Sequence, residues 1–251
     1  RKSVSPMQNI YNEILQSKKE KKKLLAILLD PDKISKDSLQ SIIPKINQSP
    51  ATHIFIGGSL VLTNTIDGII RELKQKTALP VLLFPGNPSQ ISIEAHGILF
   101  LTLLSGRNPD FLIEHQVKAA PILKKTNLEI ISTGYILIDG GNQTAVASVS
   151  KTIPLPRHNS DIAVATALAG EFLGNKLVYL EAGSGAKLSV PLETISLVSK
   201  NIEIPLIVGG GIKDIQGIED AYAAGADLVV IGTAFENDSN FFINSNLMLH
   251  D

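Results

Sequence analysis

The sequence reads Ile204-Pro-Leu-Ile-Val-Gly-Gly-Gly-Ile212 and, after a helical pattern from Asp214 to Ala226, continues as Asp227-Leu-Val-Val-Ile-Gly-Thr-Ala234. Each of the two stretches is a short apolar run that stops at glycine. Unpaired backbone N–H groups next to a helix start attract negative charge, because the amides and the helix dipole act together. Two such turns on neighbouring parallel strands are how (β/α)8 barrels commonly hold a phosphate. The pair therefore predicts a barrel that handles a phosphorylated small molecule.

Six further apolar runs precede these two, with helical patterns between them. The runs are continuous rather than alternating, as expected for parallel strands that are buried on both faces. Eight such strands predict an α/β chain that folds as one (β/α)8 TIM barrel domain over residues 1–251, with a Rossmann or flavodoxin-like sheet as the alternative. The expected strands are Leu24–Asp30, His53–Gly58, Pro80–Pro85, Gly97–Leu104, Glu129–Leu137, Lys176–Gly183, Pro205–Gly211 and Asp227–Ala234.

An extra helix is expected ahead of the first strand, because Met7, Ile10, Tyr11, Ile14 and Leu15 fall at helical spacing. The basic run Lys18-Lys-Glu-Lys-Lys-Lys23 follows it. A solvated turn is the favoured interpretation of this run, and a diphosphate or membrane site is the alternative.

Composition limits the partners and the location. The chain has 251 residues, with 23 Lys+Arg against 24 Asp+Glu, and this balance predicts no nucleic-acid surface. It has no cysteine, which excludes disulfides and fits a reducing compartment. No apolar run reaches the roughly twenty residues that span a bilayer. The N-terminus lacks a signal-peptide pattern, so we expect a cytoplasmic protein.

Two connections depart from a regular barrel. The connection between strands three and four contains Pro85, Gly86, Pro88 and Gly97, and it is too short for a covering helix. It would leave an apolar groove on the barrel flank, although plain loop economy explains it equally well. The segment from Asp139 to Asn175 is long, with a helix expected over Asp161–Phe172, and long loops at the top of a barrel often act as lids.

Strand ends carry the candidate chemistry, because residues at the carboxyl ends of barrel strands face the active site. Asp30 ends strand one, and Mg²⁺ prefers one or two carboxylates together with phosphates and waters. We expect Asp30 to bind Mg²⁺ and Ser59 to supply a second oxygen. The alternative for Asp30 is a helix N-cap or an Asx turn before Pro31, and Asp32 reads as a turn residue.

Glu181 ends strand six and points to the same side as Tyr179 and Gly183. Its carboxylate is placed to accept a proton from a substrate hydroxyl, and the turn Gly183-Ser184-Gly185 would bring amides and a hydroxyl to the same substrate. The alternative is a glutamate paired with a lysine inside the barrel. The five histidines have no metal-ligand spacing and are expected to be structural.

These motifs resemble those of the geranylgeranylglyceryl phosphate synthases and the related heptaprenylglyceryl phosphate synthases. The resemblance runs from about Leu24 to Glu236, and the strand-six motif is its specific part. The matching residues are Leu29-Asp-Pro-Asp-Lys33, Ile56-Gly-Gly-Ser59, Tyr179-Leu-Glu-Ala-Gly-Ser-Gly185, Val208-Gly-Gly-Gly-Ile212 and Ile231-Gly-Thr233.

The resemblance implies an enzyme that joins sn-glycerol 1-phosphate to a long prenyl diphosphate, with geranylgeranyl diphosphate expected, in a Mg²⁺-dependent ether-forming reaction. It implies that Asp30 and Ser59 hold Mg²⁺ against the diphosphate, and that Glu181, Tyr179 and Asp30 are catalytic. The implied glycerol phosphate site comprises Tyr179, Leu180, Glu181, Ala182, Gly183, Ser184, Gly185, Gly210, Gly211, Gly232 and Thr233.

One residue departs from the family pattern. Some members carry a lysine two residues before the strand-one aspartate, where this chain has Leu28. Arg107 and Lys33 are candidates for the replacement cation. The prenyl tail is expected in the flank groove, with self-association and transient membrane contact as further expectations. The competing hypotheses are a phosphosugar isomerase or lyase, and a barrel that binds a phosphometabolite without turnover.

Overall fold

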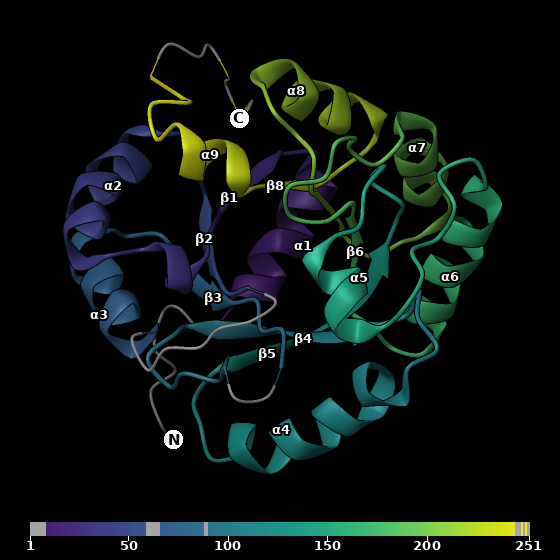
Figure 1. Cartoon of the computed structure of the whole chain (residues 1–251), viewed down its shortest axis with the longest axis horizontal. Coiled ribbons are helices and arrows are strands. Elements are labelled where there is room, and N and C mark those ends of the chain that lie inside the picture. The colour runs from purple at the N-terminus through teal and green to yellow at the C-terminus, as the bar shows by residue number, and fades with distance from the viewer. Residues whose placement is uncertain (1–8, 59–65, 88–89, 244–246, 248, 250–251) are drawn as a thin grey trace.

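Apolar strands that are buried on both faces close into a parallel barrel in the computed structural model, which describes residues 9–58, 66–87, 90–243, 247 and 249 (Figure 1). Each strand pairs with the next along the chain, and the eighth pairs with the first. The predicted (β/α)8 fold is confirmed, and an open doubly wound sheet is excluded. The strands are β1 (Leu24–Leu29), β2 (His53–Ile56), β3 (Val81–Leu83), β4 (Gly97–Leu103), β5 (Glu129–Leu137), β6 (Leu177–Glu181), β7 (Leu206–Gly209) and β8 (Leu228–Ile231).

Helices surround the barrel and follow the strands (Figure 1). The α-helices are α1 (Ile10–Glu20), α2 (Lys36–Gln48), α3 (Ile66–Lys76), α4 (His115–Leu123), α5 (Ala145–Ser150), α6 (Ser160–Phe172), α7 (Leu192–Asn201), α8 (Ile215–Ala224) and α9 (Thr233–Asn237). A 3₁₀ turn, η1 (Pro31–Lys33), follows β1, and a π-helical segment, η3 (Asp110–Glu114), leads into α4.

Side chains alternate along each strand between two apolar layers. Tyr179 and Ile207 point into the barrel interior, whereas Leu180 and Val208 face the surrounding helices. Because side-chain direction has a period of two in a strand, the sequence register decides which residues reach the barrel mouth.

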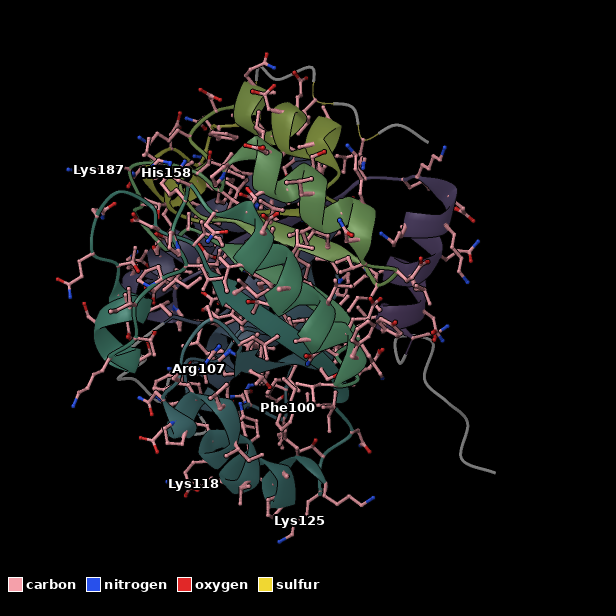
Figure 2. The ribbon with its side chains drawn as sticks, turned by 90° about the vertical axis from the view of Figure 1, so that its right-hand side faces the viewer. Phe100, Arg107, Lys118, Lys125, His158 and Lys187 are labelled. Carbon is pink, nitrogen blue, oxygen red and sulfur yellow. The ribbon has the colours of Figure 1, made fainter. Side chains whose placement is uncertain are left out.

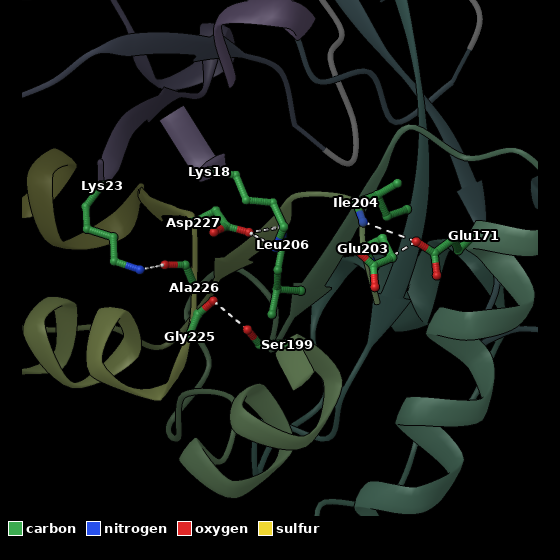
Figure 3. Close-up of polar contacts among 10 residues, drawn as sticks. All are labelled: Lys18, Lys23, Glu171, Ser199, Glu203, Ile204, Leu206, Gly225, Ala226 and Asp227. Atoms are coloured by element: carbon green, nitrogen blue, oxygen red, sulfur yellow. Dashed lines mark hydrogen bonds and ion pairs between the residues drawn. The ribbon is translucent and has the colours of Figure 1, made fainter. Parts of the chain in front are cut away.

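Helix α1 covers the end of the barrel that lies away from the viewer in Figure 1, and its Ile10 and Ile14 belong to the interior layer. The interpretation of the Lys18–Lys23 run as a solvated turn is wrong at its two ends. Lys18 Nζ lies 3.0 Å from Asp227 Oδ2, and Lys23 Nζ donates to Ala226 O at 2.8 Å (Figure 3). The Asp227 carboxylate also accepts from the backbone N–H of Leu206, so these lysines join α1 to the start of β7 and β8.

The connections differ from the expected plan in two places. Strand β8 ends at Ile231, three residues earlier than expected, because Thr233 already begins α9. The long segment before β6 contains α5, which was not expected, while α6 lies where a helix was predicted. No α-helix occurs among the described residues between β3 and β4, as the short connection predicted. Across the described part of the chain, no helix is both long and apolar enough to cross a membrane.

Candidate active site

Glu181 is the last residue of β6, and its side chain reaches the barrel mouth on the same side as Tyr179. The residue is only 5% exposed, and its Oε1 accepts a hydrogen bond from Gly183 N at 2.6 Å. Burial raises the pKa of the Glu181 carboxyl to about 7, against the opposing effect of the Tyr179 hydroxyl and the Gly183 N–H. No lysine of the described residues affects this pKa, so the structure does not support a lysine partner for Glu181. A carboxylate with a pKa near neutrality is suited to general-base chemistry.

The glycine turn after β7 lies directly against this carboxylate. Gly210 and Gly211 both have positive φ angles, +82° and +70°, which a residue with a side chain rarely adopts. A Cβ added at Gly210 would overlap Glu181 Oε1 and lie 2.6 Å from Gly183 N. Glycine is therefore required here both by the backbone conformation and by the close approach of the β6 end.

The ends of β6 and β8 also meet at the mouth. Ser184, in the turn after β6, and Thr233, in the first turn of α9, have their hydroxyl oxygens 3.2 Å apart. Gly232 separates β8 from α9. Among the predicted glycerol phosphate residues, Gly210 therefore lies against Glu181 and Gly183, and Ser184 lies beside Thr233. The side chains of Leu180 and Ala182 instead belong to the layer between barrel and helices.

An aromatic cluster, formed by Phe84, Tyr135 and Tyr179, lies beside Glu181. Phe84 stacks on Tyr179 with ring centroids 5.4 Å apart, and Tyr135 lies 5.7 Å from Phe84 and 5.3 Å from Tyr179. The Tyr179 hydroxyl is buried, and within the part of the chain that the structure describes it has no hydrogen-bond partner of good geometry. Burial, with a smaller effect of the Glu181 charge, raises the pKa of both tyrosines well above the ordinary value, so both stay neutral.

The groove predicted on the barrel flank is present on the far side of this cluster. It is a mostly apolar space of about 810 Å³, its open mouth included, between the β3–β4 side of the barrel and the η3–α4 helix. Phe84 and Tyr135 line its inner end, and Gly58 and Gly86 lie at the mouth of the barrel. The other lining side chains include Ile98, Phe100, Leu101, Phe111, Gln116 and Ala119.

Asp30 lies at the end of β1 and has the N-cap role that was its alternative interpretation. Its Oδ1 accepts from Asp32 N at 3.1 Å, and its Oδ2 lies 3.7 Å from Lys33 Nζ. A Cβ at Gly58 would stand 3.2 Å from Asp30 Oδ1, so the carboxylate lies beside the β2 end, just before Ser59. Ser59 itself lies outside the described residues.

The Asp30 carboxylate is a suitable ligand for Mg²⁺. Within the described ranges, no three His, Cys, Asp or Glu side chains converge on a point that could hold a metal. Mg²⁺ does not require such a cluster, because one or two carboxylates with substrate phosphates and waters suffice. The Asp30 side chain, which is 25% exposed, can supply one such carboxylate, and its role as a ligand stays a prediction.

Neither candidate for the replacement cation is free of other bonds. Leu28 lies against the end of β8, its Cβ 3.6 Å from where a Cβ at Gly232 would stand. Lys33 Nζ lies 2.9 Å from Glu236 Oε2, and Arg107 Nη1 donates to the backbone carbonyls of Leu104 and Gly106. Of the two, only Lys33 lies beside Asp30.

Several residues around the site were not expected from the sequence. Phe84 directly follows β3, and Tyr135 lies near the end of β5. An aromatic residue at such a position is the sequence signal that could have identified them. Thr144 lies in the loop after β5, and its buried hydroxyl has no hydrogen-bond partner among the described residues, although its side chain packs against Gly183. The loop is attached to the mouth through Arg157, which donates to the carbonyls of Asp139 and Ser189. Whether this loop acts as a lid stays a prediction.

Comparison with known proteins gives consistent matches over nearly the whole chain. Residues 16–248 match the PcrB family. The chain is 70% identical over 233 residues to a geranylgeranylglyceryl phosphate synthase of Flavobacterium johnsoniae, covering 93% of this chain and 96% of that protein. It is 41% identical to the synthase of Pyrococcus furiosus, over 89% and 88% of the two chains.

A solved structure extends the likeness to three dimensions. The (S)-3-O-geranylgeranylglyceryl phosphate synthase of Thermoplasma acidophilum, crystallised in complex with its substrate sn-glycerol-1-phosphate, superposes with a TM-score of 0.88 at 32% identity. The match covers 93% of this chain and 94% of that one. The likeness therefore includes the whole barrel and the strand ends described above.

Proposed function

The chain belongs to the PcrB family, and from that premise we propose that it is a prenyltransferase that makes geranylgeranylglyceryl phosphate from sn-glycerol 1-phosphate and geranylgeranyl diphosphate. One observation carries the proposal. A buried carboxylate, Glu181, lies between a glycine turn suited to phosphate and an aromatic cluster that leads into an open apolar groove. A small phosphorylated nucleophile and a long apolar electrophile would meet at that point.

The glycine turns would hold the nucleophile. Gly210 and Gly211, with Gly232 and Thr233, offer backbone amides to the glycerol phosphate. Ser184 adds a hydroxyl near Thr233, while the Gly183 amide already donates to Glu181. This arrangement would direct a glycerol hydroxyl toward the Glu181 carboxylate, which lies against the same turn.

The reaction would form one bond and break one. The glycerol hydroxyl oxygen attacks the allylic carbon of the prenyl diphosphate, the carbon–oxygen bond to diphosphate breaks, and diphosphate leaves with the bonding electrons. Glu181 accepts the hydroxyl proton as the ether forms. The faces of Phe84, Tyr135 and Tyr179 would stabilise positive charge that develops at the allylic carbon, since aromatic faces attract cations.

Asp30, on the opposite side of the mouth, would hold Mg²⁺, and Ser59 is retained as its predicted partner. When bound, the ion supplies Lewis-acid stabilisation of the departing diphosphate. Lys33, already close to Asp30 and Glu236, would position that carboxylate and limit its repulsion of the anionic substrate.

A product assay tests the proposal. The protein is incubated with Mg²⁺, sn-glycerol 1-phosphate or sn-glycerol 3-phosphate, and prenyl diphosphates of increasing length, and ether products are identified by mass. We expect an ether from sn-glycerol 1-phosphate that disappears with a chelator. No ether product from any pair would contradict the proposal, and covalent trapping of a phosphosugar by borohydride would favour the isomerase or lyase.

The groove assignment has its own control. Ala119 is buried and lines the groove from α4. Ala119→Phe should block geranylgeranyl diphosphate while geranyl diphosphate, which fills less of the groove, remains a substrate. Equal loss of both substrates would indicate a general defect instead.

A homo-oligomer and a cytoplasmic location complete the proposal. Exposed Phe172 and Leu173 at the end of α6 offer one apolar surface for self-association. Sedimentation equilibrium of the full chain tests this directly, and a monomer at all concentrations would contradict it.

A further inference from the structure

The outer side of the η3–α4 helix exposes an unusual amount of apolar surface. Helix α4 is apolar on more than one side: Ala119 and Leu123 are buried against the barrel, while Val117 and Ile122 are 57% and 49% exposed. Ile113, in η3, is 59% exposed. A helix that is apolar all round is normally buried. This one lies on the outside of the barrel.

The exposed residues form one continuous face. Ile113 and Val117 are four residues apart, and Lys124 follows seven residues later, so these three lie along one stripe of the helix. Lys118, Ile122 and Lys125 form the neighbouring stripe. Figure 2 shows Lys118 and Lys125 on the outer edge of the molecule, with Phe100 behind them on the barrel side of the helix. We call these six residues the α4 outer face.

The opposite side of the same helix lines the apolar groove on the barrel flank. Phe111, Gln116 and Ala119 face the groove from η3 and α4. The other side of the groove is formed by the β3–β4 connection, where Ile91 lines the groove and Ile93, two residues later, is 71% exposed. The groove therefore runs between two segments that both carry exposed isoleucines.

We propose that the α4 outer face docks on an anionic lipid bilayer, which places the groove at the acyl region so that a prenyl diphosphate passes directly from the bilayer. The reason for docking rests on the proposed function, but the binding itself does not. Apolar side chains on such a face enter the headgroup boundary, and each lysine near the surface gains from the anionic lipids.

The charges favour a bilayer over a second copy of the chain. Lys118 pairs with Glu114 at 3.2 Å, but Lys124 and Lys125 form no ion pair with any described residue. In a two-fold dimer through this face the patch would meet a second copy of itself, so its positive charge would face the same positive charge on the partner. Lipid phosphates instead complement them.

Flotation of the full chain with vesicles tests the proposal, using phosphatidylcholine alone and an equal mixture with phosphatidylglycerol. We expect binding to the anionic vesicles that weakens as salt rises. Replacing both Lys124→Gln and Lys125→Gln should weaken binding roughly thirtyfold, at about 1 kcal/mol for each lysine. Ile113→Ser with Val117→Ser should weaken it about tenfold or more. The matched control is Ile153→Ser with Ile243→Ser, which removes two exposed apolar residues outside the α4 outer face and should leave vesicle binding unchanged.

Three results would overturn the docking proposal: no flotation with anionic vesicles, equal flotation of folded outer-face variants and wild type, or loss of an oligomer on Ile113→Ser with Val117→Ser. Circular dichroism checks folding, and the lysine variants change only exposed side chains. Ether synthesis from geranyl diphosphate without vesicles tests the proposed function separately. An active enzyme that never floats would overturn docking alone, and a protein that floats without making ether would overturn the function alone.

Discussion

Replacing Glu181 with glutamine should remove activity and at the same time stabilise the protein at alkaline pH. The buried carboxyl has its pKa raised from 4.5 to about 7. Between those values the native chain holds a proton that the unfolded chain has released, so stability falls as pH rises from about 4.5 to about 7. Above pH 7 the full cost of the buried charge, about 3 kcal/mol, lowers the free energy of unfolding.

Glu181→Gln removes that charge, and the glutamine oxygen can still accept the Gly183 N–H. We expect kcat to fall by about 10²–10⁴, the usual contribution of a general base. Wild-type kcat should rise with pH through about 7 and then level off, while any residual activity of the variant should lack that step. Urea unfolding at pH 8 should show the variant up to about 3 kcal/mol more stable than wild type, and the two should be equal at pH 4.

Steady-state kinetics and urea unfolding across pH 4–9 measure both effects in the same preparations. Glu193→Gln changes an exposed glutamate in the first turn of α7 and serves as the matched control. A Glu181→Gln enzyme with kcat within a factor of ten of wild type would remove Glu181 from the reaction. A variant less stable than wild type at pH 8 would show that burial of the Glu181 charge does not lower the stability of the wild-type protein.

Three further substitutions have expected outcomes. Gly210→Ala should lower the free energy of unfolding by about 1–3 kcal/mol and abolish binding of sn-glycerol 1-phosphate in calorimetry, because its Cβ overlaps the β6 carboxylate and its φ is positive. Asp30→Asn keeps the turn acceptor but removes the negative charge, so titration of activity with Mg²⁺ should require at least tenfold more metal. Asp227→Ala should destabilise by about 2–3 kcal/mol in urea, since Leu206 N–H loses its buried acceptor and Lys18 its partner, with kcat unchanged.

Each of these has a matched control. Gly174 also has a positive φ, +93°, but nothing within 4 Å of an added Cβ, so Gly174→Ala should leave substrate binding intact. Asp32→Asn neutralises the neighbouring turn residue and should leave the metal requirement as it is. Glu20→Ala removes an exposed acid from α1 and should cost little stability. A control that behaves like its partner would contradict the corresponding argument.

More of the candidate site than of its surroundings could be predicted from the sequence. Glycine runs and terminal carboxylates are local signals, so Asp30, Glu181 and Gly210 could be predicted as a set at strand ends. Period-two alternation placed Glu181 and Tyr179 on one side of β6, and the structure agrees. The same alternation directs Leu180 and Ala182 away from the mouth, although their motif had included them.

Local sequence patterns could not predict the contacts between distant segments. The ion pair of Lys18 with Asp227 joins residues 209 positions apart, so no local pattern indicates that the basic run anchors a helix. The cluster of Phe84, Tyr135 and Tyr179 draws on three strands, and only barrel closure brings them together. Helix α5 is too short to give a periodic pattern.

The sequence by itself determined the barrel, its strand order and the residue types at each strand end, because parallel strands buried on both faces leave a continuous apolar pattern and their ends a glycine or a carboxylate. Only the tertiary structure decided the chemistry of those residues. Burial between β6 and the β7 turn raises the pKa of Glu181, and the groove beside it is open where the described residues between β3 and β4 form no α-helix. Burial and shape depend on neighbours that are distant in the chain, and they exist only once the barrel has closed.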